Sequence, residues 1–368
     1  MAPDASTPES PGREVPSSQR AGIGVALPGG VAPQRAAHLA AQAEAAGCEA
    51  VWVLDVRRDP YLLSADAIGA TGRVAVGTNV AVAFARSPTV TATAAWDLAG
   101  WSDDRFVLGL GSQVGPTLEA RFGVVADHPA PRMRDYVRAV RACFEAFRRG
   151  YGGYQGEFYS IRRPALQPGP EHREQDPPIY VAAVNPLMAR VAGEVADGLA
   201  AHPFSTEPHL SRVVLPALAA GAANAGRPRP PLLLQLVVAP SRQAAAAQML
   251  AYTVPAYRRV LDESGLGEVA DSVMAAAREG RRSQARELIE RHLLDHLGVI
   301  VDDDDSSLRR GLERWRPYAD RISLSVPWFG MNDSEQAEAF ERLLEGVTAL
   351  HETGPGRRDR PLHPKGVR

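Results

Sequence analysis

Short apolar runs rich in β-branched residues alternate along most of this chain with longer segments whose apolar positions recur at helical spacing. The alternation extends from about Ala21 to about Leu350. Strand-like runs separated regularly by helical patterns predict an α/β protein built of repeated βα units. Eight runs have the character of buried strands, and each is followed by helix: residues 21–28, 50–54, 73–84, 105–111, 179–184, 198–204, 231–239 and 320–326.

The helical segments carry start and stop signals. The segment from Ala32 is closed by Gly47, and Pro88 stands in the first turn of the helix after the third strand, where a missing N–H group costs little. Residues 116–123 are expected to form a small turn, and residues 243–261 one long helical stretch. Eight parallel strands with their helices close into a barrel, whose functional face is formed by the loops after the strands. The pattern therefore predicts a (β/α)8 TIM barrel.

Two stretches interrupt this pattern, and both ends of the chain lie outside it. Residues 151–178 have no helical period and many turn residues, which predicts an insertion of short strand and loop on the rim. Residues 266–297 predict a helical insertion, and both insertions are expected to cover the mouth and set specificity. Residues 1–20 and 351–368 are predicted to be a disordered leader and tail. We expect one folded domain over residues 21–350.

The composition narrows the possible partners. With 45% hydrophobic and 23% charged residues, the 368-residue chain can bury a large core. A formal net charge of −2 gives no reason to expect nucleic acid or an anionic membrane, and no segment approaches the roughly 18 consecutive apolar residues of a membrane helix. Cys48 and Cys143 lie far apart in alanine-rich helical patterns, which indicates a reducing compartment. We expect a cytoplasmic protein that acts on a small molecule.

Two sequence features raise the question of a metal site. The four consecutive carboxylates of Asp302 to Asp305 cannot converge on one ion without a looping backbone, and Ca²⁺ loops space their ligands alternately. The stretch HLLDH, which contains His292 and His296, lacks the glutamate beside the first histidine that a zinc protease helix requires. We predict no metal, and interpret the acidic run as a solvated turn that caps the next helix.

The stretch RFVLGLGSQVG, residues 105–115, has glycines spaced almost like a nucleotide-binding loop. The dinucleotide fingerprint needs Gly-x-Gly-x-x-Gly, usually in the first βα unit of an open sheet. Gly109, Gly111 and Gly115 are one residue too far apart and follow three βα units. They are better placed on a barrel rim, where they either only let the chain turn or let a flat ring or phosphate approach the backbone.

Several long motifs carry a resemblance to a known family. They lie in order between about Val51 and Phe204: GTNVAVAFARSP, WDLAGWSDDRFVLGLGSQV, ARFG, RMRDYVRAVRA, GEFY and PPIYVAAVNPLMARVAGEVADGLAAHPF. The chain resembles the bacterial luciferase-like superfamily, and most closely the actinobacterial oxidoreductases that use coenzyme F420, a deazaflavin. The resemblance implies a barrel, commonly a homodimer, with a flavin or deazaflavin across the C-terminal mouth.

The resemblance assigns cofactor contacts to two strand ends. Asn79 and Val80 match the end of the third strand, where relatives often hold a non-proline cis peptide against the cofactor ring. Gly111, Ser112 and Gln113 match the loop that passes beside the polar edge or ribityl chain of the cofactor.

A third cofactor contact is implied at the loop that opens the fifth helix. Val184, Asn185 and Pro186 match the segment that relatives use for the cofactor phosphate. A helix N-terminus offers free N–H groups and partial positive charge to an anion, Pro186 suits the first helical position, and Asn185 is a good N-cap. Relatives commonly have glycine where this chain has Asn185, so the phosphate is expected to be held less closely.

The catalytic positions depart from the family pattern. In LDVRRDP, Asp55 keeps a carboxylate and is implied both as a cofactor contact and as a catalytic group, but Val56 stands where relatives have threonine or a catalytic histidine. Arg58 replaces a histidine, and Val114 stands where some relatives carry an acidic proton donor. Hydride transfer still needs a group that balances charge or a proton on the substrate. Neither valine can do so.

The catalytic candidates that remain are Asp55, Arg58 and His202, with Asp59 and Arg86 also expected at the mouth. Asp55 and Arg58 could form an ion pair or orient an anionic substrate, or they could be a surface salt bridge worth at most about 1 kcal/mol. His202 ends the sixth strand and could be either a general acid near neutral pH or a structural histidine that caps a loop.

These features predict an F420-dependent oxidoreductase that transfers a hydride between the deazaflavin and a small organic substrate. Two alternatives stay open. One is an FMN-dependent luciferase-like monooxygenase, and the other is a repurposed or cofactor-independent barrel with a degenerate redox site, which the missing acid and histidine positions motivate.

Overall fold

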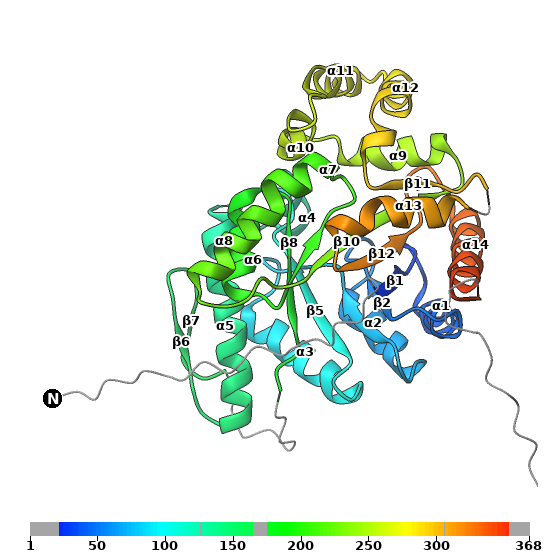
Figure 1. The fold of residues 1–368 in the computed structure, drawn as a ribbon. Coiled ribbons are helices and arrows are strands. Elements are labelled where there is room, and N and C mark those ends of the chain that lie inside the picture. Colours follow the sequence, from blue (N-terminus) through cyan, green and yellow to red (C-terminus); the bar gives the residue numbers. More distant parts are fainter. Residues whose placement is uncertain (1–21, 126, 165–174, 305, 353–368) are drawn as a thin grey trace, which may run out of the picture.

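The computed structural model describes residues 22–125, 127–164, 175–304 and 306–352 (Figure 1). The eight barrel strands are β1 (Gly22–Ala26), β2 (Ala50–Val53), β3 (Ala75–Thr78), β5 (Phe106–Gly111), β8 (Ile179–Ala183), β9 (Gly198–Ala201), β10 (Leu232–Ala239) and β12 (Arg321–Ser325). All neighbouring pairs are parallel, and β12 pairs with both β1 and β10, which closes the barrel. The predicted (β/α)8 barrel is confirmed. The predicted leader and the tail beyond residue 352 lie outside the described residues.

The main helices surround the barrel (Figure 1). Five of them begin at a proline, whose fixed φ suits the first helical position: α1 (Pro33–Ala45), α2 (Pro60–Gly69), α3 (Pro88–Trp101), α5 (Pro129–Arg149) and α6 (Pro186–Val195). The others are α8 (Leu215–Asn224), α13 (Ser307–Trp315) and α14 (Asp333–Glu352). As predicted, Gly47 follows α1 with a left-handed φ of 87°.

Three predicted elements differ from the structure. The strand predicted over residues 73–84 is divided into β3 and the two-residue β4 (Ala81–Val82). Residues 116–123, expected as a turn, belong mostly to α4 (Gly115–Phe122), which ends at the left-handed Gly123. The long helical stretch expected over residues 243–261 is broken into α9 (Arg242–Tyr252), a 3₁₀ turn (Pro255–Tyr257) and α10 (Arg258–Asp262). Pro255 is the physical reason for the break, because proline lacks an N–H group and disfavours helical backbone in the residue before it.

The two insertions lie in different places. The strands β6 (Tyr154–Gln155) and β7 (Ser160–Ile161) form a short antiparallel hairpin that packs against α5. The helices α11 (Gly267–Arg278) and α12 (Arg282–His292) stack with α9 and α10 above the barrel (Figure 1), over a separate apolar core that includes Phe204 and Val237. They are followed by β11 (Val299–Val301), which pairs with the upper part of β10.

The inside of the barrel is filled with side chains. Trp52, Leu54, Tyr180 and Leu233 are buried there, and the Trp52 and Tyr180 rings lie 6.3 Å apart. A packed interior leaves ligands only the ends of the barrel, and the carboxyl ends of the strands form the end where barrel sites occur.

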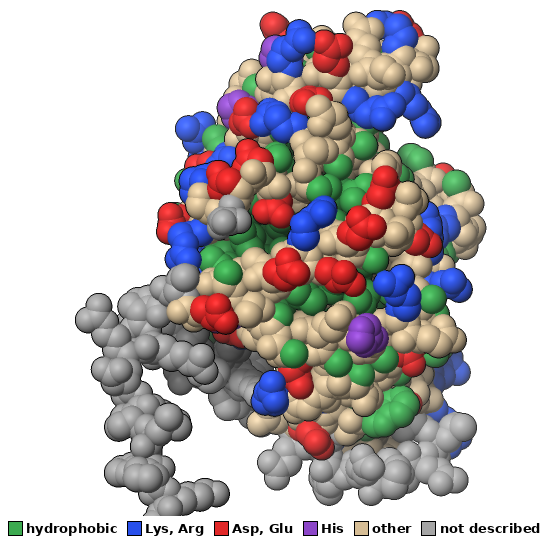
Figure 2. Space-filling model, turned by 90° about the vertical axis from the view of Figure 1, so that its right-hand side faces the viewer, with side chains coloured by type: hydrophobic (Ala, Val, Ile, Leu, Met, Phe, Trp, Pro, Cys, Tyr) green, Lys and Arg blue, Asp and Glu red, His purple; other side chains and the backbone are tan. Residues whose placement is uncertain are grey.

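The surface is electrostatically mixed on the side of α14 and α1, where acidic and basic side chains are interspersed (Figure 2). Within the described ranges, none of the helices combines the length and apolarity needed to cross a bilayer. Cys48 and Cys143 are buried free thiols, and burial raises the pKa of Cys48 to about 12.

Candidate active site at the barrel mouth

The carboxylate of Asp55 lies at the end of β2 and is enclosed, with 4% of the side chain exposed. One oxygen accepts hydrogen bonds from the N–H group of Val82 at 3.1 Å and from Nη1 of Arg86 at 3.2 Å. The other oxygen lies 3.5 Å from Nη2 of Arg121, which projects from α4. Val82 belongs to β4 (Ala81–Val82), the short strand after β3. Asp55 therefore ties together three segments of the mouth, and its charge is neutralised within the protein.

Arg58 is not the partner of Asp55. Its side chain is exposed, and no ion pair joins it to another residue that the structure describes. The neighbouring Arg57 lies 3.7 Å from Asp333 at the surface. The Asp55 to Arg58 ion pair considered from the sequence is wrong, because arginines from distant segments occupy that carboxylate.

Asp59 caps the first turn of α2 and also binds Arg86. Its carboxylate accepts from the N–H groups of Tyr61 at 2.9 Å and Leu62 at 3.3 Å, and Nη2 of Arg86 donates at 2.8 Å. Burial acts to raise the pKa of Asp59, but the bonds from Arg86 and from the helix N–H groups outweigh it and lower that pKa. Arg86 is thus held between two carboxylates.

We expect Asp55→Asn to lower the free energy of unfolding by about 2 kcal/mol, because Arg86 and Arg121 lose an enclosed partner while Arg86 keeps Asp59. The matched control is Asp333→Asn, which removes the same charge from an exposed pair and should cost less than about 0.5 kcal/mol. Urea unfolding at pH 7 measures both. Equal losses in the two variants would contradict the enclosed network.

The junction between β3 and β4 contains a cis peptide bond between Asn79 and Val80. A cis bond here is what the family resemblance implied. Asn79 is 8% exposed, and its N–H group donates to the backbone oxygen of Val53 at 2.8 Å. Its side-chain nitrogen is enclosed and has no partner among the described residues. Buried polar groups are nearly always paired, so this amide is a donor suited to a ligand oxygen.

Gly111 ends β5 directly opposite this junction. A Cβ at Gly111 would lie 2.6 Å from Cγ2 of Val80, so only glycine permits this approach. The next two side chains are used locally, since the Ser112 hydroxyl donates to the Gln113 backbone oxygen and Gln113 Oε1 accepts from the N–H group of Val114. Gln113 has a left-handed φ of 60°. What this loop offers a ligand is mainly its backbone.

The loop after β8 places a helix start at the same rim. As expected, α6 begins at Pro186 and Asn185 occupies the N-cap position. Asn185 is exposed and its side chain makes no capping bond, while Val184 is partly buried against the core below α9. The first-turn N–H groups of α6 therefore lack a side-chain cap, which suits an anionic group.

His202 follows β9 and is half-buried between two aromatic rings. The Tyr257 ring is stacked on it at 4.9 Å and 28°, and the Tyr252 ring meets it edge-on at 4.3 Å. Burial lowers the pKa of His202 to about 3. The imidazole is therefore neutral near pH 7, which argues against the imidazolium acid considered from the sequence.

Four residues of the mouth were missed by sequence reasoning: Arg121, Tyr252, Tyr257 and Trp328. Trp328 follows β12 just as the predicted site residues follow their strands, so its position was a usable signal. Tyr252 and Tyr257 flank the break before Pro255, in a segment expected as continuous helix. Arg121 lies in the stretch expected as a turn.

The question of a metal site, raised by the acidic run that begins at Asp302, can be tested on the described residues. Within the described ranges, no group of three or more His, Cys, Asp or Glu side chains is placed to hold a metal ion. Asp304 instead accepts hydrogen bonds from Ser306 and Arg310.

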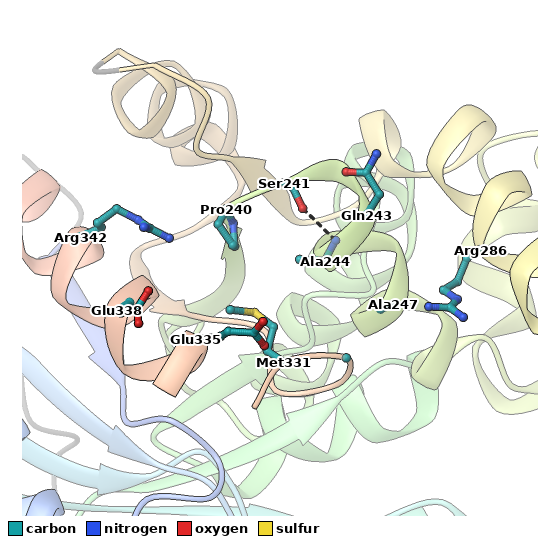
Figure 3. Close-up of a pocket in the computed structure, with 11 residues that line it drawn as sticks. Pro240, Ser241, Gln243, Ala244, Ala247, Arg286, Met331, Glu335, Glu338 and Arg342 are labelled. Atoms are coloured by element: carbon teal, nitrogen blue, oxygen red, sulfur yellow. Dashed lines mark hydrogen bonds between the residues drawn. The ribbon is translucent and has the colours of Figure 1, made fainter. Parts of the chain in front are cut away.

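A pocket between α9, α12 and α14 lies beside the rim (Figure 3), but it is lined by Arg286, Glu335 and other residues that are not among the mouth residues above.

The fold brings these residues together at the strand ends that form the C-terminal mouth of the barrel. A family model described as luciferase-like monooxygenase matches residues 15–318. The chain belongs to this bacterial luciferase-like family of flavin- and deazaflavin-dependent oxidoreductases.

Similar proteins are found at several distances. The uncharacterized protein Rv1360 of Mycobacterium tuberculosis is 35% identical over 296 residues, which are 76% of this chain and 87% of that protein. An F420-dependent glucose-6-phosphate dehydrogenase of Kineococcus radiotolerans is 30% identical over 208 residues, covering 53% of this chain and 60% of that enzyme. The structure of a coenzyme F420-dependent tetrahydromethanopterin reductase from Methanopyrus kandleri aligns with a TM-score of 0.75 at 18% identity, covering 91% of this chain and all of that one. This structural likeness supports the fold.

Proposed function

We propose that this protein is an F420-dependent oxidoreductase that transfers a hydride between the deazaflavin and a small organic substrate. The observation that carries the proposal is the enclosed, unpaired amide of Asn79, which lies at the cis peptide opposite Gly111. A flat ring that carries a carbonyl oxygen would supply the missing acceptor. The F420 name of the glucose-6-phosphate dehydrogenase relative favours a deazaflavin over FMN.

The residues present fit such a cofactor at two further points. The backbone of Gly111 to Gln113 would pass beside its polar edge, and the uncapped start of α6 at Asn185 and Pro186 would hold its phosphate. When bound, the deazaflavin supplies a hydride donor or acceptor. The protein supplies position and electrostatics: Asp55 holds β4 and α4 in place, and His202 lies on the other side of the mouth.

The resemblance also supports a cytoplasmic homodimer. Leu62 on α2 and Val90 on α3 are 69% and 58% exposed, and these two helices pack side by side. Exposed apolar side chains on adjacent helices suit a subunit contact.

Titration of the purified full-length protein with oxidised F420 and with FMN, followed by fluorescence, tests the cofactor. We expect F420 to bind at concentrations of about 10 μM or below, and Asn79→Ala to weaken binding about tenfold through loss of one hydrogen bond. Asn224→Ala, at an exposed position on α8, is the matched control and should bind as the wild type does.

The other outcomes point to the alternatives. Binding of FMN alone, with oxygen consumed when it is reduced, would support a monooxygenase. If neither cofactor binds at tens of micromolar, the redox proposal fails and a cofactor-independent barrel is favoured.

A further inference from the structure

The hydrogen bonding of His202 selects one tautomer. Nδ1 accepts a hydrogen bond from the N–H group of Phe204 at 3.1 Å, so the proton of the neutral ring is on Nε2. Nε2 has no acceptor among the described residues, and it is not one of the enclosed side-chain nitrogens that lack a partner. The half-buried ring therefore presents a free N–H donor at the mouth.

A rigid aromatic wall surrounds this donor. Tyr257 stacks on His202, and Tyr252 packs against its edge. The Tyr252 hydroxyl accepts from Nε2 of Gln248 at 2.8 Å, and Oε1 of the fully buried Gln248 accepts from the N–H group of Trp328 at 2.8 Å. Gln248 thus fixes the tyrosine and the tryptophan loop relative to each other.

The wall continues without charge toward β1 and β2. The Trp328 ring lies 6.1 Å from that of Tyr252, and on its other side it packs with Val56 in one apolar cluster that also contacts Gly29. Burial keeps the aromatic groups neutral as well, raising the pKa of Tyr257 to about 12 and lowering that of His202 to about 3. The side chains that form this wall, from His202 to Val56, are therefore uncharged near pH 7, whereas the basic Arg57 and Arg58 follow Val56 at the exposed surface.

We infer that the substrate is an uncharged, flat molecule with a carbonyl group, and that Nε2–H of His202 donates a hydrogen bond to the carbonyl oxygen. The inference rests on the proposed function, which supplies the hydride. Hydride addition to the carbonyl carbon breaks the C=O π bond and leaves negative charge on the oxygen, and a proton from water completes the alcohol. The Nε2–H group stabilises that developing charge. His202 thereby does the work that Val56 and Val114 cannot.

Calorimetric titration of the full-length protein with three matched probes tests the substrate class: acetophenone, benzoate and ethylbenzene. We expect acetophenone to bind at least about tenfold more tightly than benzoate. His202→Phe should weaken acetophenone binding about tenfold and leave ethylbenzene binding within about twofold, because only the donor is lost. His202→Gln keeps a donor and an acceptor and should retain most of the preference, while His38→Gln, exposed on α1, should change nothing.

A second readout follows His202 itself. Histidine-selective ¹⁵N NMR should show the Nε2–H tautomer unchanged from pH 8 to pH 5, with a shift on adding acetophenone but not ethylbenzene. Titration of His202 near pH 6.5, benzoate binding as tight as that of acetophenone, or equal weakening of all three probes in His202→Phe would overturn the inference. The calorimetric and NMR measurements are both made first without cofactor, so they test the substrate inference independently of F420 binding. A failure of F420 to bind would contradict the proposed function instead.

Discussion

Replacing Gly109 by alanine is expected to lower the free energy of unfolding by about 3 kcal/mol or more, because the added methyl group has nowhere to go. A Cβ at this position would overlap the backbone oxygen of Thr78 and press on Cγ1 of Val80. The strands cannot separate to relieve the overlap at low cost, since the Thr78 hydroxyl accepts from the N–H group of Gly109 at 2.9 Å and donates to its backbone oxygen at 2.7 Å.

The matched control for Gly109→Ala is Gly69→Ala. A Cβ at Gly69, the last residue of α2, meets nothing within 4 Å, so this change should be neutral or stabilising by up to about 1 kcal/mol. Urea unfolding compares the two variants, and F420 titration should show loss of binding in Gly109→Ala alone. If both variants were as stable as the wild type, β3 and β5 could not approach as closely as described.

The barrel could be predicted from the sequence because its strands are buried on both faces. Such strands appear as continuous apolar runs, and the prolines and glycines between them mark where helices begin and end. The segment around Pro255 was misjudged because the alanine-rich residues before it have strong helical preference. Proline outweighs that preference, and the resulting break places Tyr252 and Tyr257 against His202.

The site could be predicted only as a set of positions. Strand ends meet at one face of a barrel, so the predicted strands were enough to assign Asp55, Gly111 and His202 to that face. Asn79 lies inside the strand predicted over residues 73–84 and was assigned to the mouth only by the family resemblance. Their partners could not be assigned in this way. Asp55 pairs with Arg86, 31 positions along the chain, and with Arg121, 66 positions along. Local sequence spacing does not encode contacts between residues so far apart.

The structure divides the mouth into two chemically different sides. The ends of β3, β5 and β8 offer backbone groups, the Asn79 amide and an uncapped helix start. On the other side, His202 follows β9 and Trp328 follows β12 next to Val56, and both contact the tyrosines of the segment after β10. A cofactor with a polar edge and phosphate suits the first side, and an apolar reactant suits the second. Valine at position 56, where relatives have threonine or a catalytic histidine, is consistent with this division, since its side chain packs in one cluster with Trp328.

Acidification from pH 6.5 to pH 5 is expected to lower the free energy of unfolding by about 2 kcal/mol for each of His202 and His209, at about 1.4 kcal/mol per pH unit. His209 is fully buried, and neither ring nitrogen has a hydrogen-bond partner in the described part of the chain. Burial lowers its pKa to about 4, and the backbone of Val184 opposes the shift without being in hydrogen-bonding geometry. The pKa of His202 is lowered to about 3.

Acidification destabilises the folded state because the unfolded chain binds more protons than the folded chain does. Below pH 6.5 the unfolded chain takes up protons on both histidines while the folded chain does not, so stability present above pH 6.5 is lost as the pH falls toward 4 and 3. The pKa of Asp59 is lowered, so its contribution to the free energy of unfolding is lost only below about pH 4. Asp59 therefore does not affect the change expected between pH 6.5 and pH 5. Urea midpoints at pH 7 and pH 5 should therefore differ less in His202→Gln and in His209→Gln than in the wild type, and His38→Gln should behave as the wild type. A wild-type midpoint that stays constant from pH 7 to pH 5 would mean that both rings accept protons in the folded protein, and the neutral His202 donor would then be wrong.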